Sequence, residues 1–284
     1  MTLVLRKCWQ DGSSSNRFKY GQVRERVICP DWEPEPICGH GLHGLLKGNG
    51  DWRLLEGSDW LVIDADDQIV NIDNDKCKFN TGVILFRGTA EELSKSEFPH
   101  KFNLNSESAY QWAMHIGNHD IMINKITDPK YAYRWAISIG NIDLMFDKIS
   151  SSEAAYLWAV DIGNRDVMIN KITDSKYAYY WARSIGNCDI MIDKVADSEW
   201  AYWWARNIGN RDVMINKITE SRDAYWWAIF IGDKNVMIDK ITNSEWAYWW
   251  AKDIGNQNVM KSKVTEKYWI QKWNEDFPFH RIES

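Results

Sequence analysis

The chain has 284 residues, with 34 Lys and Arg against 40 Asp and Glu and a formal net charge of −6. A hydrophobic fraction of 45% with 26% charged residues is typical of a globular protein and excludes a disordered chain. The negative net charge gives no global attraction to nucleic acid or anionic lipid.

Membrane, secretion and disulfide signals are missing from the sequence. No stretch reaches ~18 uninterrupted apolar residues, and the apolar run within residues 1–12 is too short for a signal peptide. The five cysteines, at positions 8, 29, 38, 77 and 188, are odd in number and scattered. We therefore expect mostly free thiols, no membrane segment and a cytoplasmic location.

Residues 1–104 are predicted to form a small β-rich or α+β domain. Most prolines and all glycines outside the repeat described below lie in this part, which predicts frequent turns. Short strand-like runs separated by turn signals occupy residues 60–63, 68–72 and 82–87.

Three short motifs in this part carry a resemblance. They are Arg17-Phe-Lys-Tyr-Gly21, Cys38-Gly-His-Gly-Leu-His43, and residues 73–88. In this order they resemble a small domain of unknown function found in phage and prophage proteins. The resemblance implies a viral or mobile-element origin and, through it, a host factor as partner and the host cytoplasm as location. It implies no activity.

Cys38, His40 and His43 are the candidate metal ligands of the chain. With Cys29 or Cys77 they could form a tetrahedral zinc site, although their spacing is not that of a recognised zinc motif. The alternatives are a buried cysteine with a histidine hydrogen-bonded in a turn, or an acid–base role for His43. Residues 39–44 also match the dinucleotide-binding fingerprint, but no helix is predicted after them, so nucleotide binding is not expected.

A 23-residue repeat fills residues 105–265. Each unit carries a tyrosine, a tryptophan two positions later, a glycine and a lysine at fixed spacing. The tryptophans are Trp112, Trp135, Trp158, Trp181, Trp204, Trp227 and Trp250, and the lysines are Lys125, Lys148, Lys171, Lys194, Lys217, Lys240 and Lys263. Seven units without an insertion indicate that each unit occupies an equivalent position.

One unit, residues 197–219, predicts two short helices. Asp197 is the expected N-cap of the first helix, and the left-handed residue Gly209 is expected to end it. The first helix has an apolar stripe of helical period, and Asn210 is expected to cap the second helix. The predicted stripe consists of Ala201, Trp204, Ala205 and Ile208, and the predicted apolar side of the second helix consists of Val213, Met214 and Ile218.

Such short helices are unstable alone, so each unit must pack on its neighbours. The sequence therefore predicts an α+β protein, with the domain at 1–104 followed by an α-solenoid of seven helix-turn-helix repeats at 105–265. The unit resembles the helix pair of an ankyrin repeat without its β-hairpin, for which 23 residues leave no room. Residues 266–284 keep helical spacing but lose the unit pattern, and are expected to form a C-terminal capping helix.

The lysine column has two interpretations. Evenly spaced cations could follow a nucleic-acid backbone, but residues 106–265 hold 18 Lys and Arg against 20 Asp and Glu. A lysine near the end of a helix also has a structural role. We therefore favour the structural interpretation, and binding to nucleic acid is not expected.

Two variable positions of the first helix are aromatic in the later units and, being three residues apart, share one face. We call these seven residues the aromatic ladder: Tyr177, Tyr180, Trp200, Trp203, Trp226, Trp246 and Trp249. Exposed rings of this size mark an interaction surface, whereas covered rings would be packing between units. Both interpretations stay open.

The favoured function is non-enzymatic binding of a protein partner through the ladder. One alternative is an enzyme or small-ligand binder that uses Cys38, His40 and His43, with the solenoid as targeting arm. Another is a stacking platform for single-stranded nucleic acid or glycan. No nucleophile with its base, zinc-protease motif or phosphate loop is recognised, so no catalytic residue is assigned and zinc is the one cofactor considered.

Overall fold

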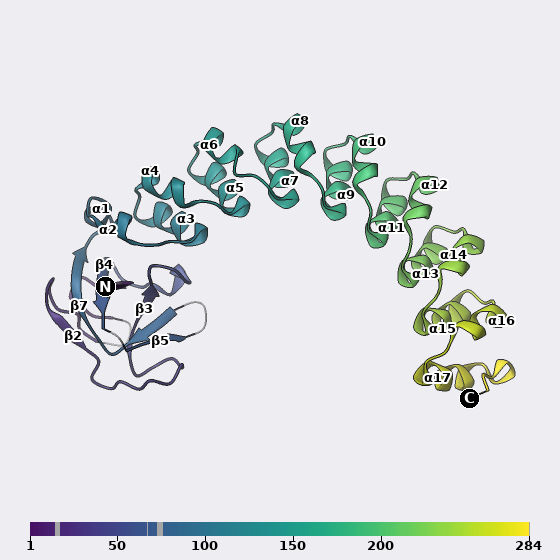
Figure 1. Cartoon of the computed structure of the whole chain (residues 1–284), viewed down its shortest axis with the longest axis horizontal. Helices are drawn as coiled ribbons and strands as arrows, with labels where there is room; N and C mark the ends of the chain where they lie inside the picture. Colours follow the sequence, from purple (N-terminus) through teal and green to yellow (C-terminus); the bar gives the residue numbers. More distant parts are fainter. Residues whose placement is uncertain (15–17, 67, 73–75, 284) are drawn as a thin grey trace. The chain divides into compact units, whose positions relative to one another are not determined.

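The computed structural model describes residues 1–14, 18–66, 68–72 and 76–283. It divides into two compact units, residues 1–150 and residues 151–284. Strands occur in unit 1 and helices in both units, so the predicted α+β class is confirmed (Figure 1).

An antiparallel sheet forms the N-terminal part of unit 1, with strands in the order β2-β7-β4-β1-β3-β6-β5. The strands are β1 (Thr2–Cys8), β2 (Arg26–Ile28), β3 (Leu42–Leu46), β4 (Asp59–Ala65), β5 (Ile69–Ile72), β6 (Lys76–Phe79) and β7 (Thr81–Gly88). The runs predicted at 60–63, 68–72 and 82–87 correspond to β4, β5 and β7 and are confirmed. Sequence reasoning missed the other four strands.

The interior strand β4 pairs with β1 along its whole length and with β7 on its other side. Its residues 60–63 are almost fully buried, as expected for a strand covered on both faces. Val4, Leu42 and Ile84 pack in the same core on one face of the sheet. The buried residues of the sheet therefore form the core of this part of the chain.

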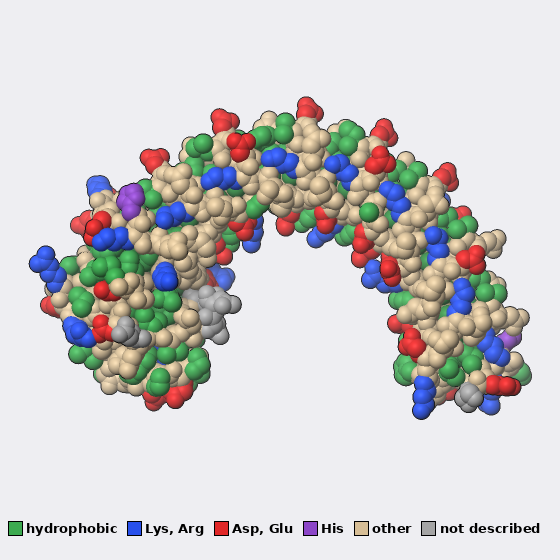
Figure 2. Space-filling view, in the orientation of Figure 1, with side chains coloured by type: hydrophobic (Ala, Val, Ile, Leu, Met, Phe, Trp, Pro, Cys, Tyr) green, Lys and Arg blue, Asp and Glu red, His purple; other side chains and the backbone are tan. Residues whose placement is uncertain are grey.

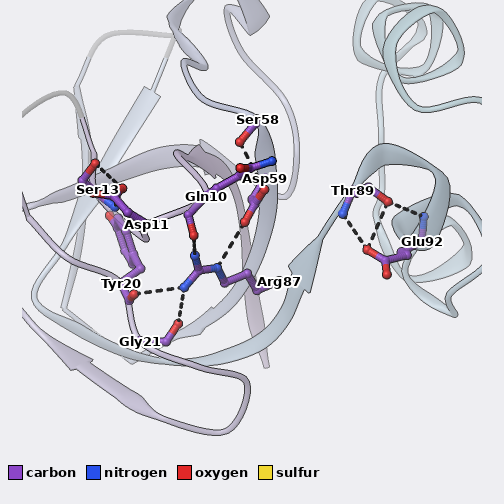
Figure 3. A network of polar contacts seen from close by, with 10 residues as sticks. All are labelled: Gln10, Asp11, Ser13, Tyr20, Gly21, Ser58, Asp59, Arg87, Thr89 and Glu92. Carbon is purple, nitrogen blue, oxygen red and sulfur yellow. Dashed lines mark hydrogen bonds and ion pairs between the residues drawn. The ribbon is translucent and has the colours of Figure 1, made fainter.

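Arg87, near the end of β7, joins loops that are distant in sequence (Figure 3). Its guanidinium donates hydrogen bonds to the carbonyl oxygens of Gln10, Tyr20 and Gly21, at 2.6, 3.3 and 3.1 Å, and lies 3.4 Å from the Asp59 carboxylate. Two of the motifs that carry the phage resemblance thus meet at Arg87. Arg17 and residues 73–75 of those motifs lie outside the described residues.

The remainder of unit 1 is helical. Thr89 and Glu92 form a capping box that begins its first α-helix (Figure 3). The helices are α1 (Ala90–Ser94), α2 (Phe98–Lys101), α3 (Ser106–His115), α4 (His119–Met122), α5 (Pro129–Ser138) and α6 (Ile142–Phe146), with 3-10 helices at Trp52–Leu54 and Ile123–Lys125. The domain boundary predicted after residue 104 falls between α2 and α3.

In unit 2, a ten-residue first helix and a shorter second helix alternate along the chain. The first helices are α7 (Ser152–Asp161), α9 (Ser175–Ser184), α11 (Ser198–Asn207), α13 (Ser221–Phe230), α15 (Ser244–Asp253) and α17 (Lys267–Asp276). The second helices are α8 (Arg165–Met168), α10 (Cys188–Met191), α12 (Arg211–Met214), α14 (Lys234–Lys240) and α16 (Gln257–Met260), with 3-10 turns at Ile169–Lys171, Ile192–Lys194, Ile215–Lys217, Lys261–Lys263 and Pro278–His280. Within this unit the first helices lie along one side and the second helices along the other (Figure 1).

The predicted helix boundaries hold in the segment 197–219. The Asp197 side chain accepts hydrogen bonds from the backbone amides of Glu199 and Trp200, as an N-cap does. Gly209 has φ +121° and ends α11. Asn210 begins α12 in the left-handed conformation, at φ +54°, and its side chain makes no capping hydrogen bond. Its position was predicted correctly and its capping role was wrong.

Burial in the same segment confirms most of the apolar positions predicted for its two helices. Trp204, Met214 and Ile218 are fully buried, with Ala201 and Ala205 beside them. The prediction for Val213 was wrong, because 43% of this side chain is exposed. The second helix has one α-helical turn followed by a 3-10 turn. Such a short helix turns only a narrow side toward α11. Met214 occupies that side, and the neighbouring Val213 points away from it.

Successive segments are joined by the serine that begins each of the first helices α7, α9, α11, α13 and α15. Ser198 Oγ accepts hydrogen bonds from the backbone amides of Thr219 and Glu220, both at 3.2 Å, at the start of the next segment. Ser244 does the same with the backbone amides of Thr265 and Glu266. Since these amides precede the next helix, the contact fixes where that helix begins.

Helix α17 is the C-terminal member of the series of first helices. It lies in the segment 266–284, which was predicted to form a cap. Its Trp273 is fully buried and donates a hydrogen bond from Nε1 to the carbonyl oxygen of His280, at 2.7 Å. Asn274 exchanges two hydrogen bonds with the backbone of Ile282. The described C-terminal residues therefore fold back on α17.

Candidate functional site

The lysine column is bonded to the main chain of the preceding segment. Lys217 Nζ donates hydrogen bonds to the carbonyl oxygens of Ile192 and Val195, at 2.7 and 2.6 Å. Equivalent bonds run from Lys125 to Phe102, from Lys148 to Ile123 and Ile126, from Lys194 to Ile172, from Lys240 to Ile218, and from Lys263 to Ile238. The predicted structural role is confirmed for these lysines, although each lysine bonds the preceding segment rather than its own helix.

The seven residues of the aromatic ladder lie on four neighbouring first helices of unit 2. Tyr177 and Tyr180 are on α9, Trp200 and Trp203 on α11, Trp226 on α13, and Trp246 and Trp249 on α15. Every one of these side chains is half-buried, whereas the repeat tryptophans on the same helices are fully buried. The ladder is thus neither core nor freely exposed.

For Trp200 and Trp246, the partial burial comes from ring contacts between neighbouring first helices. The Trp200 ring lies 5.5 Å from Tyr179 and 5.6 Å from Tyr180, both on α9. Trp246 stands in the same way against Tyr225 and Trp226 of α13, at 5.3 and 6.5 Å between centroids. These contacts cover one part of each of these two rings and fix its orientation. Packing between units therefore accounts for the covered part of the ring, and the open part stays a candidate interaction surface.

Two aromatic residues extend the ladder. Phe230 is 51% exposed, stacks on Trp226 at 5.6 Å, and lies under the Arg206 guanidinium at 4.3 Å. Trp269 on α17 lies 5.3 Å from Tyr248. The signal for Trp269 was present in the sequence, since it stands 23 residues after Trp246. Phe230 had no signal, because its position is polar in the neighbouring units.

Charged groups support the tyrosines beneath the ladder. Tyr248 donates a hydrogen bond from its hydroxyl to the Asp276 carboxylate, at 2.5 Å, and Tyr225 donates likewise to Asp253. In the ladder itself, burial raises the pKa of Tyr177 to about 12, and the nearby Glu153 carboxylate adds to this rise. The phenols are therefore neutral hydrogen-bond donors at physiological pH.

Charged side chains of both signs are mixed over the surface of unit 2. Figure 2 shows acidic and basic side chains interspersed over its helices, with no continuous patch of one sign on the face in view. Arg222 and Glu199 form an ion pair at 3.1 Å between α13 and α11, next to the ladder. A polyanion would therefore meet alternating charges along this surface.

In unit 1, the structure brings together two of the three candidate metal ligands. Cys38 and His43 line a pocket of about 400 Å³ with Arg6, Lys7 and Lys76. Cys38 is exposed at the pocket, and His43 lies on β3. Burial, together with the Arg6, Lys76 and Lys78 cations, lowers the pKa of His43 to about 4, so its imidazole is neutral at pH 7.

His40 does not line the pocket that Cys38 and His43 share. It has φ +44°, lines a second pocket, and its Nδ1 lies 3.2 Å from the Asp31 carboxylate. Within the described ranges, no group of three or more His, Cys, Asp or Glu side chains could hold a metal ion. The zinc site stays a prediction, with Cys38 and His43 as the pair that shares a pocket.

The glycine-rich stretch at 39–44 runs into β3, because Leu42–Gly44 pairs with β6. The element that follows directly is strand β3 and not an α-helix, so the strand–turn–helix arrangement that a dinucleotide requires is missing there. The stretch therefore leads into a strand where the fingerprint would lead into a helix.

Comparisons with protein-family models, with curated proteins and with solved structures give no match. Among the described helices, none combines the length and the hydropathy of a membrane span.

Proposed function

We propose that the chain is a non-enzymatic binding protein, in which an α-solenoid of 23-residue repeats presents the aromatic ladder to a protein partner. The solenoid is supported by the constant spacing of the first helices and by the serine and lysine bonds between segments. Through these contacts each helix pair is stabilised mainly by its neighbours.

The observation that carries the proposal is the half-burial of the ladder rings. Rings such as Trp200 and Trp246 are oriented by contacts on one edge, yet keep part of their surface open. Rigid, partly open Trp and Tyr side chains supply large contact area at low entropic cost, and they dominate the binding energy of protein interfaces.

The partner best suited to this surface is a polypeptide segment with aliphatic or aromatic side chains flanked by charges of both signs. Arg206 and Lys252 lie over the ladder rings of Trp203 and Trp249. On the same helices, Glu199 pairs with Arg222, and Asp253 accepts a hydrogen bond from Tyr225. Such a mixture complements a peptide better than it complements a phosphate backbone, which needs cations of one sign.

The experiment compares two double variants with the same spacing. Trp203→Ala with Trp249→Ala removes two rings of the ladder. Val213→Ala with Val259→Ala is the control, because these side chains are 43% and 46% exposed on second helices of the same repeats. Photo-crosslinking from position 226 identifies the partner, and titration with the purified partner gives the affinity of each variant.

The proposal expects at least about a tenfold loss of affinity in the tryptophan variant, the loss that accompanies removal of one interface anchor, and none in the valine variant. Equal loss in both variants, or loss in the valine variant alone, would overturn it. Salt-sensitive binding of a labelled single-stranded oligonucleotide that depends on Trp203 and Trp249 would replace the protein partner by nucleic acid.

A further inference from the structure

A pocket in the N-terminal sheet has an excess of positive charge. β1 pairs with β3 only at Val4–Leu46 and Leu5–Leu45, and Arg6 and Lys7 follow just beyond that pairing. The pocket, of about 400 Å³, lies where β1 and β3 cease to pair. Its lining residues are Arg6, Lys7, Cys38, Gly39, His43, Gly44, Leu45, Leu54, Leu55, Glu56 and Lys76.

The cations of the pocket come from two strands. Arg6 and Lys7 are on β1, and Lys76 is on β6, which pairs with β3 beside His43. Lys7 Nζ lies over the Trp60 ring at 4.4 Å, and the Arg6 guanidinium lies over the Tyr20 ring and donates a hydrogen bond to the carbonyl oxygen of His43. These contacts hold Arg6 and Lys7 in place.

Counter-charge is scarce around these cations. Glu56 is the one carboxylate in the lining, so three cations against one carboxylate leave an excess of two positive charges. In the part of the chain that the structure describes, no carboxylate lies within ion-pair distance of Arg6, Lys7 or Lys76.

A buried lysine adds to the positive potential. Lys78, next to this group on β6, is fully buried, and within the described ranges its Nζ has no hydrogen-bond partner. The His43 imidazole stands among the same cations, and its Nε2 is likewise buried without such a partner. Uncompensated cations in a partly enclosed site are costly unless an anion neutralises them.

We propose that this pocket binds a small molecule through a phosphate group, with Lys7, Lys76 and Arg6 as the cationic contacts. A phosphate group carries about −1.5 to −2 charges at pH 7, which matches the excess of two positive charges better than a single carboxylate does. The volume lies within the range of small-molecule sites. The proposal is independent of the aromatic ladder.

Cys38 provides a direct reporter of occupancy. It is exposed and lines the pocket, while Cys8, Cys29 and Cys77 are buried. In a Cys188→Ser background, the rate of Cys38 alkylation by N-ethylmaleimide is measured against increasing inorganic pyrophosphate at constant ionic strength. Isothermal titration calorimetry of the wild-type chain with pyrophosphate gives the affinity without any substitution.

Saturable protection of Cys38 and a measurable heat of binding are expected. Lys7→Gln with Lys76→Gln should weaken pyrophosphate binding at least about tenfold, because each variant side chain loses a charge-assisted hydrogen bond to the phosphate. Lys19→Gln with Lys95→Gln, which removes two exposed lysines outside the pocket, should change nothing. Circular dichroism confirms that each variant is folded.

Absence of binding by the wild-type chain in both measurements would overturn the proposal. Protection that the control variant loses as strongly as the pocket variant would do the same, because it would reflect overall charge. Citrate binding in the pocket with no response to pyrophosphate would overturn the phosphate assignment in favour of a carboxylate ligand.

Discussion

Lys217 Nζ donates a hydrogen bond to the carbonyl oxygen of Val195 at 2.6 Å, across the boundary between two successive 23-residue segments. A second bond from the same ammonium reaches the carbonyl oxygen of Ile192, at the start of the 3-10 turn that ends the preceding segment. Carbonyl groups at a helix end lack intrahelical donors, so a lysine from the next segment satisfies them. The lysine column therefore joins segments and is not free for a ligand.

Lys217→Met should lower the free energy of unfolding by ~1.5–3 kcal/mol, the usual worth of a hydrogen bond to a charged group. Urea denaturation followed by circular dichroism measures the change. Lys234→Met is the control, because Lys234 is exposed in the next segment. An equal loss in both variants, or no loss for Lys217→Met, would show that the bonds to Ile192 and Val195 do not contribute.

Features that depend on one segment alone could be predicted from the sequence. Asp197, Gly209 and Trp204 act through local capping, a left-handed backbone and helical periodicity, all of which are written in consecutive residues. The contacts of Ser198 and Lys217 could not be predicted, because each joins residues about 20 positions apart and depends on how neighbouring segments pack.

The N-terminal sheet was harder to predict because charged residues interrupt its strand patterns. Lys78 is fully buried on β6, and Arg6 and Lys7 follow three apolar residues on β1, so neither strand shows simple alternation. The same cations form the pocket around His43. Sequence reasoning singled out Cys38 and His43 but missed the cations, because β1, β3 and β6 meet only in the folded sheet.

Replacing Trp204 should cost more stability than replacing Trp203. Trp204 is fully buried, and Trp204→Ala should lower the free energy of unfolding by ~3–5 kcal/mol. Trp203 is half-buried, so Trp203→Ala should cost less than half as much. Urea denaturation of both variants provides the comparison. Equal costs would make the ladder part of the core and remove it as a binding surface.

Gly209→Ala isolates the strain of a left-handed backbone. Gly209 has φ +121°, and a Cβ added there meets no atom within 4 Å, so steric contact with neighbours is not the cost. We expect Gly209→Ala to destabilise by ~1–2 kcal/mol, whereas Asn210→Gly, at φ +54°, should be neutral or slightly stabilising. Melting temperatures of the two variants test this, and a neutral Gly209→Ala would contradict it.

His43 should make the stability of unit 1 depend on pH in the acidic range. Its pKa is about 4 in the folded protein against 6.5 as its ordinary value, so at intermediate pH the unfolded chain binds the proton more readily. The contribution is fully present above pH 6.5 and is lost as the pH falls toward 4. Burial is the main cause, and the Arg6, Lys76 and Lys78 cations add to it, while Asp31 opposes it.

The measurement is the free energy of unfolding between pH 7.5 and 4.5 for the wild type, for His43→Gln, and for His100→Gln as a control at an exposed histidine. His43→Gln should flatten the decline between pH 6.5 and 4.5, because glutamine takes up no proton, whereas the control should follow the wild type. An NMR titration of the His43 ring with a midpoint near 6.5 would contradict the prediction. Such a midpoint would mean that the imidazole is exposed to solvent and that neighbouring cations do not lower its pKa.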